Sequence, residues 1–160
     1  NTKIMKTASL CLLTLLVSFS CGAQNSLSSI TQKNGMIGIG TSDPDQKLTV
    51  KGKIHTQEVL VDLNGAVAPD YVFEKYYQGQ SALNSDYQML DLKSLEAFLK
   101  QNHHLPEIPS AQKLKEDGLE LKKMNLLLLQ KIEELTLYTI EQQKQLDALQ
   151  DQIKLLIKQQ

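Results

Sequence analysis

A seven-residue repeat of apolar side chains between residues 119 and 157 constrains the fold more than any other feature of the sequence. Leucine and isoleucine recur there at alternating spacings of three and four residues, which places them along one side of an α-helix. One helix alone cannot bury such a seam, so the chain needs a partner helix or copies of itself. We therefore predict a coiled coil over residues 119–160. Its oligomerisation seam comprises Leu121, Asn125, Leu128, Ile132, Leu135, Thr139, Gln142, Leu146, Leu149, Ile153 and Leu156.

Polar residues interrupt this seam at Asn125, Thr139 and Gln142. Polar groups in a coiled-coil core lower stability but can fix register and strand number. The mixture of Ile and Leu in the core does not choose between two and three strands. Leu126, Leu127 and Leu129 widen the apolar surface, which favours a trimer or packing of the helix onto a small globular head. An intramolecular helical hairpin is disfavoured because no upstream segment predicts a helix of matching length.

The charge pattern argues against a nucleic-acid-binding zipper. The chain of 160 residues has a formal net charge of −1, and all 17 of its basic residues are lysine. A leucine-zipper transcription factor needs a continuous basic helix immediately before its coil. Residues 114–118 are instead Leu-Lys-Glu-Asp-Gly, which is mixed in charge and ends in glycine. We therefore expect no nucleic-acid partner.

The first residues have the pattern of an export signal. Lysines precede an apolar run from Ala8 to Phe19, which is too short to span a bilayer because a spanning helix needs about 20 residues. We predict a signal peptide over residues 1–23, cleaved after Ala23, and a protein that is secreted or displayed at the cell surface without a membrane span. Lipidation of Cys21 is the minority alternative, because position 18 holds serine where a lipoprotein signal usually has leucine.

Two segments of different amino-acid composition follow the predicted signal peptide. Residues 24–34 are polar and serine-rich, which is typical of a flexible linker. Residues 35–66 are punctuated by glycine and predict a short β-rich stalk, with Leu48, Val50 and Ile54 on one strand face. A further short strand is expected at positions 58 to 62. Strands this short bury too little to be stable in one chain, so we expect them to be completed by trimeric association.

Residues 67–118 are predicted to form a small α+β element. Leucine and phenylalanine side chains between positions 90 and 99 recur at helical spacing and indicate an amphipathic helix of about three turns. Ser110 is placed to cap a short helix over residues 111–117, and Gly118 is placed to end it. The long C-terminal helix is expected to begin directly afterwards.

Several sequence blocks resemble those of known surface proteins. Gly-Ile-Gly-Thr at 38–41, followed by Leu-Thr-Val-Lys-Gly at 48–52, resembles the trimeric strand repeat of phage-tail-fibre-like proteins. Asp-Tyr-Val-Phe-Glu at 70–74, His-Leu-Pro-Glu-Ile-Pro-Ser-Ala at 104–111 and the apolar stretch 124–138 resemble the C-terminal module of secreted tail-fibre-like proteins of the Bacteroidetes type. The resemblance implies a trimeric fibre or stalk with no defined activity.

The sequence departs from this family's pattern in two places. Ala68 precedes Pro69 where the family typically has tryptophan, and extra residues are present near 76–85. The layout is also similar to the endosialidase-type intramolecular chaperone, which cleaves itself with serine and lysine. Ser85 and Asp86 are not followed by the basic residues of that motif, so self-cleavage is disfavoured.

Other candidates for chemistry have simpler structural explanations. The Ser-x-x-Lys string that begins at Ser110 matches penicillin-interacting enzymes, but the companion motifs are missing and a helix cap explains it. His103 and His104 have no acidic or cysteine cluster beside them, so metal binding is disfavoured and His104 is expected to pack with Leu105 and bond to backbone. The tyrosines at 71, 76, 77 and 87 are either core residues, which we favour, or a ligand patch.

The sequence as a whole predicts an α+β protein with a short trimeric β-rich stalk, a small helical element and a C-terminal parallel trimeric coiled coil. We expect a secreted, noncatalytic structural or adhesin-like fibre, a homotrimer with no cofactor, metal or catalytic residues. Its cell-surface or glycan ligand is not identified by the sequence. The alternatives are an autocleaving intramolecular chaperone of the serine-peptidase type and a surface lipoprotein binding module.

Overall fold

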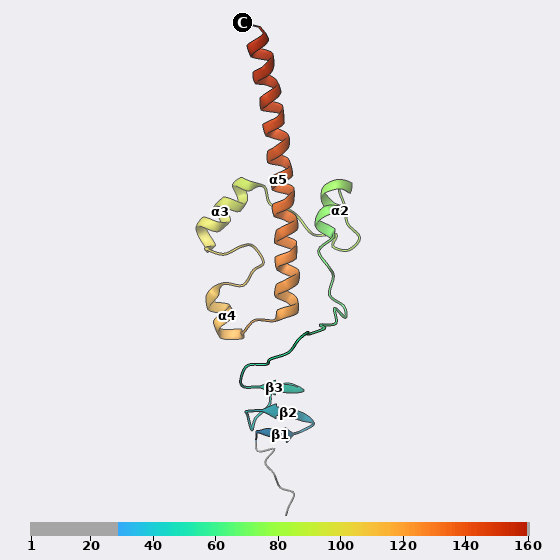
Figure 1. The fold of residues 1–160 in the computed structure, drawn as a ribbon, viewed down its shortest axis with the longest axis vertical. Helices are drawn as coiled ribbons and strands as arrows, with labels where there is room; N and C mark the ends of the chain where they lie inside the picture. Colours follow the sequence, from blue (N-terminus) through green and yellow to red (C-terminus); the bar gives the residue numbers. More distant parts are fainter. Residues whose placement is uncertain (1–28, 160) are drawn as a thin grey trace, which may run out of the picture. The chain divides into compact units, whose positions relative to one another are not determined.

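The structure, a computed structural model, describes residues 29–159 (Figure 1). The predicted signal peptide 1–23, with Cys21, lies outside these residues, as does the first part of the predicted linker. The described chain contains a three-stranded sheet and four helices, so the expected mixed α+β class is confirmed. It divides into two compact units, one ending at Val59 and the other beginning at Leu60. Within residues 29–159, no helix combines the length and apolar character needed to cross a membrane.

The first unit is built on strands β1 (Ile30–Lys33), β2 (Met36–Ile39) and β3 (Leu48–Val50). Strands β1 and β2 pair antiparallel, and β2 and β3 pair parallel. Asn34 and Gly35 have φ values of 53° and 73°, as a tight two-residue hairpin turn requires. The prediction of a flexible linker through residue 34 is therefore wrong for β1, because the Asn-Gly turn folds that segment back onto β2.

The β-rich segment is also shorter than the predicted stalk. Residues 51–66 contain no strand or helix, so the strand expected at 58–62 does not form in this single chain. Leu48 and Val50 do share one face of the sheet, as predicted, but Ile54 lies beyond the end of β3. A lone segment cannot form a strand, because strand backbone needs a paired neighbour.

The second unit contains helices α2 (Tyr71–Gln78), α3 (Leu92–Asn102), α4 (Ala111–Asp117) and α5 (Leu121–Lys158). The sequence predicted α3, α4 and the long helix, and all three are confirmed. It missed α2, and it expected β structure between 67 and 118, where the structure has helices and no strand. The element is therefore helical rather than α+β.

Local capping explains where the short helices begin and end. The Asp91 carboxylate accepts hydrogen bonds from the backbone N–H groups of Lys93 and Ser94 at the start of α3. The Ser110 hydroxyl accepts from the backbone N–H of Lys113 at the start of α4, and Gly118, with φ of 81°, ends that helix. Side-chain caps of this kind satisfy donors that a helix terminus leaves unpaired.

The apolar core of the second unit is small and lies where α2 meets α5. Val72 and Leu137 are buried almost completely, and Tyr87 joins them from the loop before α3. Partly buried tyrosine, phenylalanine and methionine side chains surround these three residues. Figure 1 shows α2 on one side of α5, with α3 and α4 on the other side.

Candidate oligomerisation interface

Helix α5 leaves the predicted oligomerisation seam uncovered along its whole length. All eleven seam residues lie on this 38-residue helix, and every one of them is exposed in the single chain. Their leucine and isoleucine members retain between 44% and 63% of their accessible surface. Aliphatic side chains left in water to this extent forgo about half of the stabilisation that full burial would give them. The structure thus brings the predicted seam residues onto one helix, and no other element within residues 29–159 covers them.

The opposite face of α5 is covered by the chain's own head element, which we define as residues 68–117. The three buried residues of α5 are Gln130, Glu133 and Leu137, spaced three and four apart. In the heptad register of the seam they occupy outer positions, on the far side of the helix from Leu128 and Leu135. The head element therefore covers one side of α5 without obstructing the seam.

Leu137 is the apolar anchor of this contact. Its side chain has no exposed surface, and it packs with Val72 of α2 and with Tyr87. The rings of Tyr71 and Tyr87 lie 5.0 Å apart between centroids and are tilted by 55°. Burial of a leucine of this kind stabilises a fold by about 1.5–3 kcal/mol relative to exposure.

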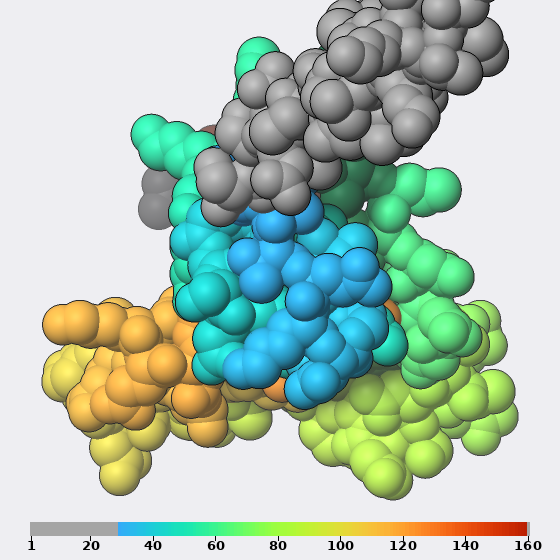
Figure 2. Space-filling view, turned by 90° about the horizontal axis from the view of Figure 1, so that it is seen from below, coloured from blue at the N-terminus to red at the C-terminus, as the bar shows by residue number. Residues whose placement is uncertain are grey.

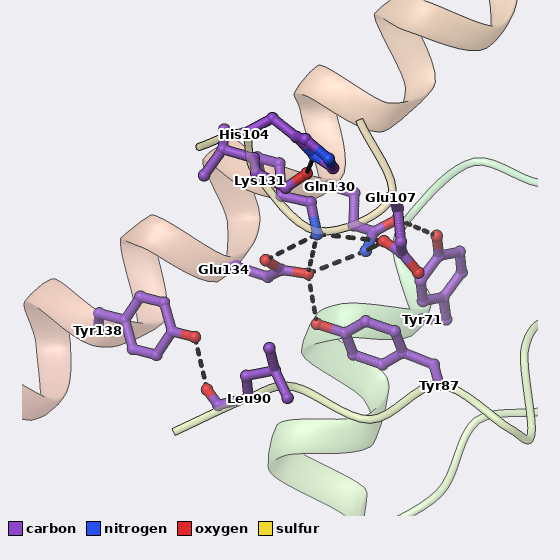
Figure 3. A network of polar contacts seen from close by, with 10 residues as sticks. Tyr71, Tyr87, Leu90, His104, Glu107, Gln130, Lys131, Glu134 and Tyr138 are labelled. Carbon is purple, nitrogen blue, oxygen red and sulfur yellow. Dashed lines mark hydrogen bonds and ion pairs between the residues drawn. The ribbon is translucent and has the colours of Figure 1, made fainter. Parts of the chain in front are cut away.

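A polar network fixes the same contact at its edge (Figure 3). The Tyr71 hydroxyl donates to Gln130 Oε1 over 2.8 Å, and the Tyr87 hydroxyl donates to Glu134 Oε1 over 3.0 Å. Gln130 Nε2 donates to Glu134 Oε1 over 2.9 Å and also donates to Glu107. The network thus links α5 to α2 and to the loops on both sides of α3.

Lys131 supplies the positive charge of this network. Its ammonium lies 3.1 Å from a Glu107 oxygen and 3.0 Å from a Glu134 oxygen, and its side chain is only 11% exposed. Because Glu134 is shielded to a similar degree, this pair is less screened by solvent than surface ion pairs are. Removing either partner would leave a poorly solvated charge on the other.

Tyrosine hydroxyls make further links between the head element and α5. The Tyr138 hydroxyl donates to the backbone oxygen of Leu90 over 2.5 Å (Figure 3). The Tyr76 hydroxyl donates to a Glu141 carboxylate oxygen. Burial raises the pKa of Tyr87 well above its usual value, and the nearby Glu134 carboxylate raises it further. Burial and then Glu107 raise the pKa of Tyr71 in the same direction. Both hydroxyls therefore stay neutral and able to donate at physiological pH.

These contacts give the tyrosines different roles. Tyr71, Tyr76 and Tyr87 pack against or bond to α5, which agrees with the expectation that they are core residues. Tyr77 is 65% exposed and belongs to neither the core nor the network. The sequence did not predict the network itself, although the apolar and aromatic residues outside the heptad positions, Leu137 above all, were a usable signal for a second contact face.

Glu133 is an exception in this otherwise well-paired contact. It is 7% exposed, and its Oε2 atom is buried without a hydrogen-bond partner in the structure. Burial raises the pKa of this carboxyl, and the neighbouring Asp70 carboxylate adds to the increase. Such a group lowers the stability of the fold when it is ionised.

One polar residue of the seam is already satisfied within its own helix. The Thr139 hydroxyl donates to the backbone oxygen of Leu135 over 2.9 Å. A threonine that bonds its own helix in this way can enter an apolar interface without leaving a donor unpaired. Its presence in the seam is therefore compatible with burial.

The other candidates for chemistry have structural roles or no assembled site. Ser110 caps α4. His104 Nδ1 lies 3.0 Å from the Leu105 backbone oxygen, and the His104 ring packs nearly perpendicular to the ring of Phe98. Among residues 29–159, no cluster of three or more His, Cys, Asp and Glu side chains is arranged to hold a metal ion. A cavity of about 200 Å³ beside Tyr138 is below the usual range for small-molecule sites.

Comparison of the chain with protein-family models, with curated proteins and with solved structures found no match in any of the three. The seam on α5 is consequently the feature on which a functional assignment has to be built.

Proposed function

We propose that this chain is a secreted, noncatalytic structural protein, a fibre or stalk whose copies associate as a parallel trimer through the seam on α5. The observation that carries the proposal is the contrast between the two faces of this helix. One face is covered by the chain's own head element, while the aliphatic seam on the other face is exposed over the entire helix.

The second half of α5 is the part of the helix that is least covered by the rest of the chain. Every residue from Gln142 to Lys158 is exposed, and the apolar ones among them retain more than half of their surface. Helices of this length gain most of their stability from packing an apolar face, because helix propensity alone is marginal. A helix that extends this far beyond its own head element is best explained by association with other helices.

Copies of the chain are better partners for the seam than any other helix within residues 29–159. Helices α2, α3 and α4 have 8, 11 and 7 residues, against 38 in α5, so none of them can cover the seam. A second copy supplies an identical aliphatic face of matching length. The seam carries no charged residue, so copies can approach without burying an unpaired charge.

The pattern of the seam favours parallel chains and three strands. Parallel alignment places Asn125 opposite its own counterpart, whereas antiparallel alignment over the full seam would set it against a leucine near the far end of α5. Leu129 lies beside the seam and is 42% exposed, which widens the apolar surface beyond what two helices bury. A third helix would cover this additional surface.

The role as a secreted fibre or stalk is supported by the predicted signal peptide and by the resemblance of the β-rich and head segments to tail-fibre-like proteins. A trimeric stem of this kind presents its other segments in three copies, which suits attachment to a surface through several weak contacts. An adhesin-like ligand at the cell surface belongs to this proposal.

The experiment that tests the proposal is sedimentation equilibrium of the full chain with a matched pair of substitutions. Leu149 and Leu155 both lie in the second half of α5, 53% and 60% exposed, but only Leu149 belongs to the seam. We expect the native chain to sediment at three times its mass of 17.9 kDa. Leu149→Lys should raise the concentration at which the trimer dissociates at least tenfold, and Leu155→Lys should not. A native chain that is monomeric at micromolar concentration would overturn the proposal.

A further inference from the structure

The three-stranded sheet of the first unit has one apolar face that no described segment of the chain covers. Cross-strand partners in a sheet share a face, and Ile39 is opposite both Ile30 and Val50. Ile37 is opposite Leu48 in the same way. These five residues therefore form one aliphatic sheet face. In Figure 2 the residues of the strands, in blue and cyan, lie together in one small body.

The aliphatic sheet face is exposed to solvent. Ile30, Ile37 and Leu48 retain 46%, 44% and 56% of their surface, and Ile39 retains 37%. A sheet of strands with four, four and three residues buries too little to be stable with one of its faces in water. The unit accordingly lacks a layer of its core.

The chain's own loop cannot supply this layer, because it is already fixed on the opposite face. The Thr49 hydroxyl accepts from the backbone N–H groups of Asp45 and Gln46 and donates to the Asp45 carboxylate over 2.8 Å. Thr41 packs closely on Gly38: a β-carbon added at Gly38 would come within 2.5 Å of the Thr41 backbone oxygen. The loop between β2 and β3 is therefore held against the Gly38 and Thr49 face of the sheet, away from the aliphatic face.

The chemistry of the open face suits a second copy of itself. Its register positions carry aliphatic residues and Gln32 but no charged side chain. The charged residue of β1, Lys33, is on the opposite face and pairs with Asp43 over 2.6 Å. Two such faces can meet without burying a charge, and a polar or charged partner would gain nothing from them.

We propose that the aliphatic sheet face is a second self-association surface, which packs against the same face of neighbouring copies. The inference rests on the proposed function, because the seam on α5 holds the copies at the high local concentration that so small an interface needs. It deepens the trimeric association expected for these strands by assigning the contact to one face of the sheet and naming the residues that form it. The sheet then acquires its missing core layer only in the assembled protein.

Disulfide trapping in the full chain tests the inference, with Cys11 and Cys21 replaced by serine. Gln32→Cys places a thiol on the aliphatic sheet face, and Asp43→Cys places one on the loop that covers the other side. Under mild oxidation we expect Gln32→Cys to form a covalent dimer on a non-reducing gel, and Asp43→Cys to remain largely unlinked. Adding Ile37→Thr to Gln32→Cys should reduce the cross-link several-fold.

Sedimentation of the same proteins separates failure of this inference from failure of the proposed function. Two outcomes overturn the inference alone. In the first, Gln32→Cys protein is trimeric but does not cross-link; in the second, it is trimeric but cross-links no better than Asp43→Cys protein. Protein that is monomeric and does not cross-link overturns both. A cross-link that forms with Gln32→Cys and is lost with Ile37→Thr in a chain that stays trimeric supports the inference.

Discussion

Leu135 and Leu137 are two residues apart on α5 but lie in opposite environments. Leu135 is 63% exposed on the seam, and Leu137 is completely buried against the head element. A rotation of about 200° separates two such positions on an α-helix, because each residue advances it by about 100°. The same helix therefore holds its own head element on one side and keeps the other side open for copies of the chain.

Leu137→Ala should destabilise the head element strongly. Truncation of a buried leucine removes its packing and leaves a cavity, which typically costs about 2–5 kcal/mol. Leu155→Ala is the matched control, because Leu155 is 60% exposed and lies outside both the core and the seam. Its effect should stay within about 0.5 kcal/mol. Urea unfolding followed by circular dichroism, at one fixed chain concentration, measures both variants.

Glu133→Gln should stabilise the protein at neutral pH. Burial and then Asp70 raise the folded-state pKa of Glu133 above its ordinary value of 4.5, so the folded chain binds this proton more tightly than the unfolded chain does. The contribution of this group to stability is therefore complete below pH 4.5 and is lost as the pH rises through the folded-state pKa. Replacing the buried carboxylate with a neutral amide should recover about 1–3 kcal/mol at pH 7.

The pH dependence of this gain separates it from a general effect of the substitution. Below pH 4.5, Glu133 is protonated in both states, so Glu133→Gln should give little or no stabilisation there. Exposed Glu120→Gln is the control and should change the free energy of unfolding little at either pH. An equal gain for Glu133→Gln at pH 3.5 and pH 7 would contradict ionisation as the cause. Urea unfolding at both pH values provides the comparison.

The helices that carry local signals could be predicted from sequence, whereas the contacts between elements could not. Ser110 and Gly118 mark the ends of α4, and the capping geometry follows from those two residues alone. The heptad spacing likewise predicted α5. Helix α2 carries no comparable signal, because it has only eight residues and its N-cap residue Asp70 makes no side-chain capping hydrogen bond.

The head–α5 contact depended on interactions between residues distant in sequence. Tyr71 and Gln130 are 59 positions apart, and Tyr87 and Glu134 are 47 apart. No local pattern specifies such pairs, because they form only after α2 and the loop before α3 have packed on Leu137. The seam could be predicted because its pattern repeats along the helix. Leu137 is a single buried leucine at an outer heptad position, so no repeating pattern reveals it.

Tyr87→Phe should weaken the contact between the head element and α5. The substitution keeps the buried ring but removes the hydroxyl that donates to Glu134, and a hydrogen bond to a charged group contributes about 1.5–3 kcal/mol. Tyr77→Phe is the control, because Tyr77 is 65% exposed and should change stability by no more than about 0.5 kcal/mol. Thermal unfolding at equal chain concentration compares the melting temperatures of the two variants. Equal melting temperatures would show that the Tyr87 hydroxyl does not stabilise the contact.

Gly38→Ala should disturb the sheet unit, whereas Gly52→Ala should not. A β-carbon at Gly38 would come within 2.5 Å of the Thr41 backbone oxygen, so the loop that covers this face must move. A β-carbon at Gly52 would meet no atom within 4 Å. Overpacking of this kind costs about 1–3 kcal/mol, and it should appear as faster amide hydrogen exchange in residues 30–50. Because both substitutions add the same methyl group, equal exchange rates in the two variants would show that the loop does not seal this face of the sheet.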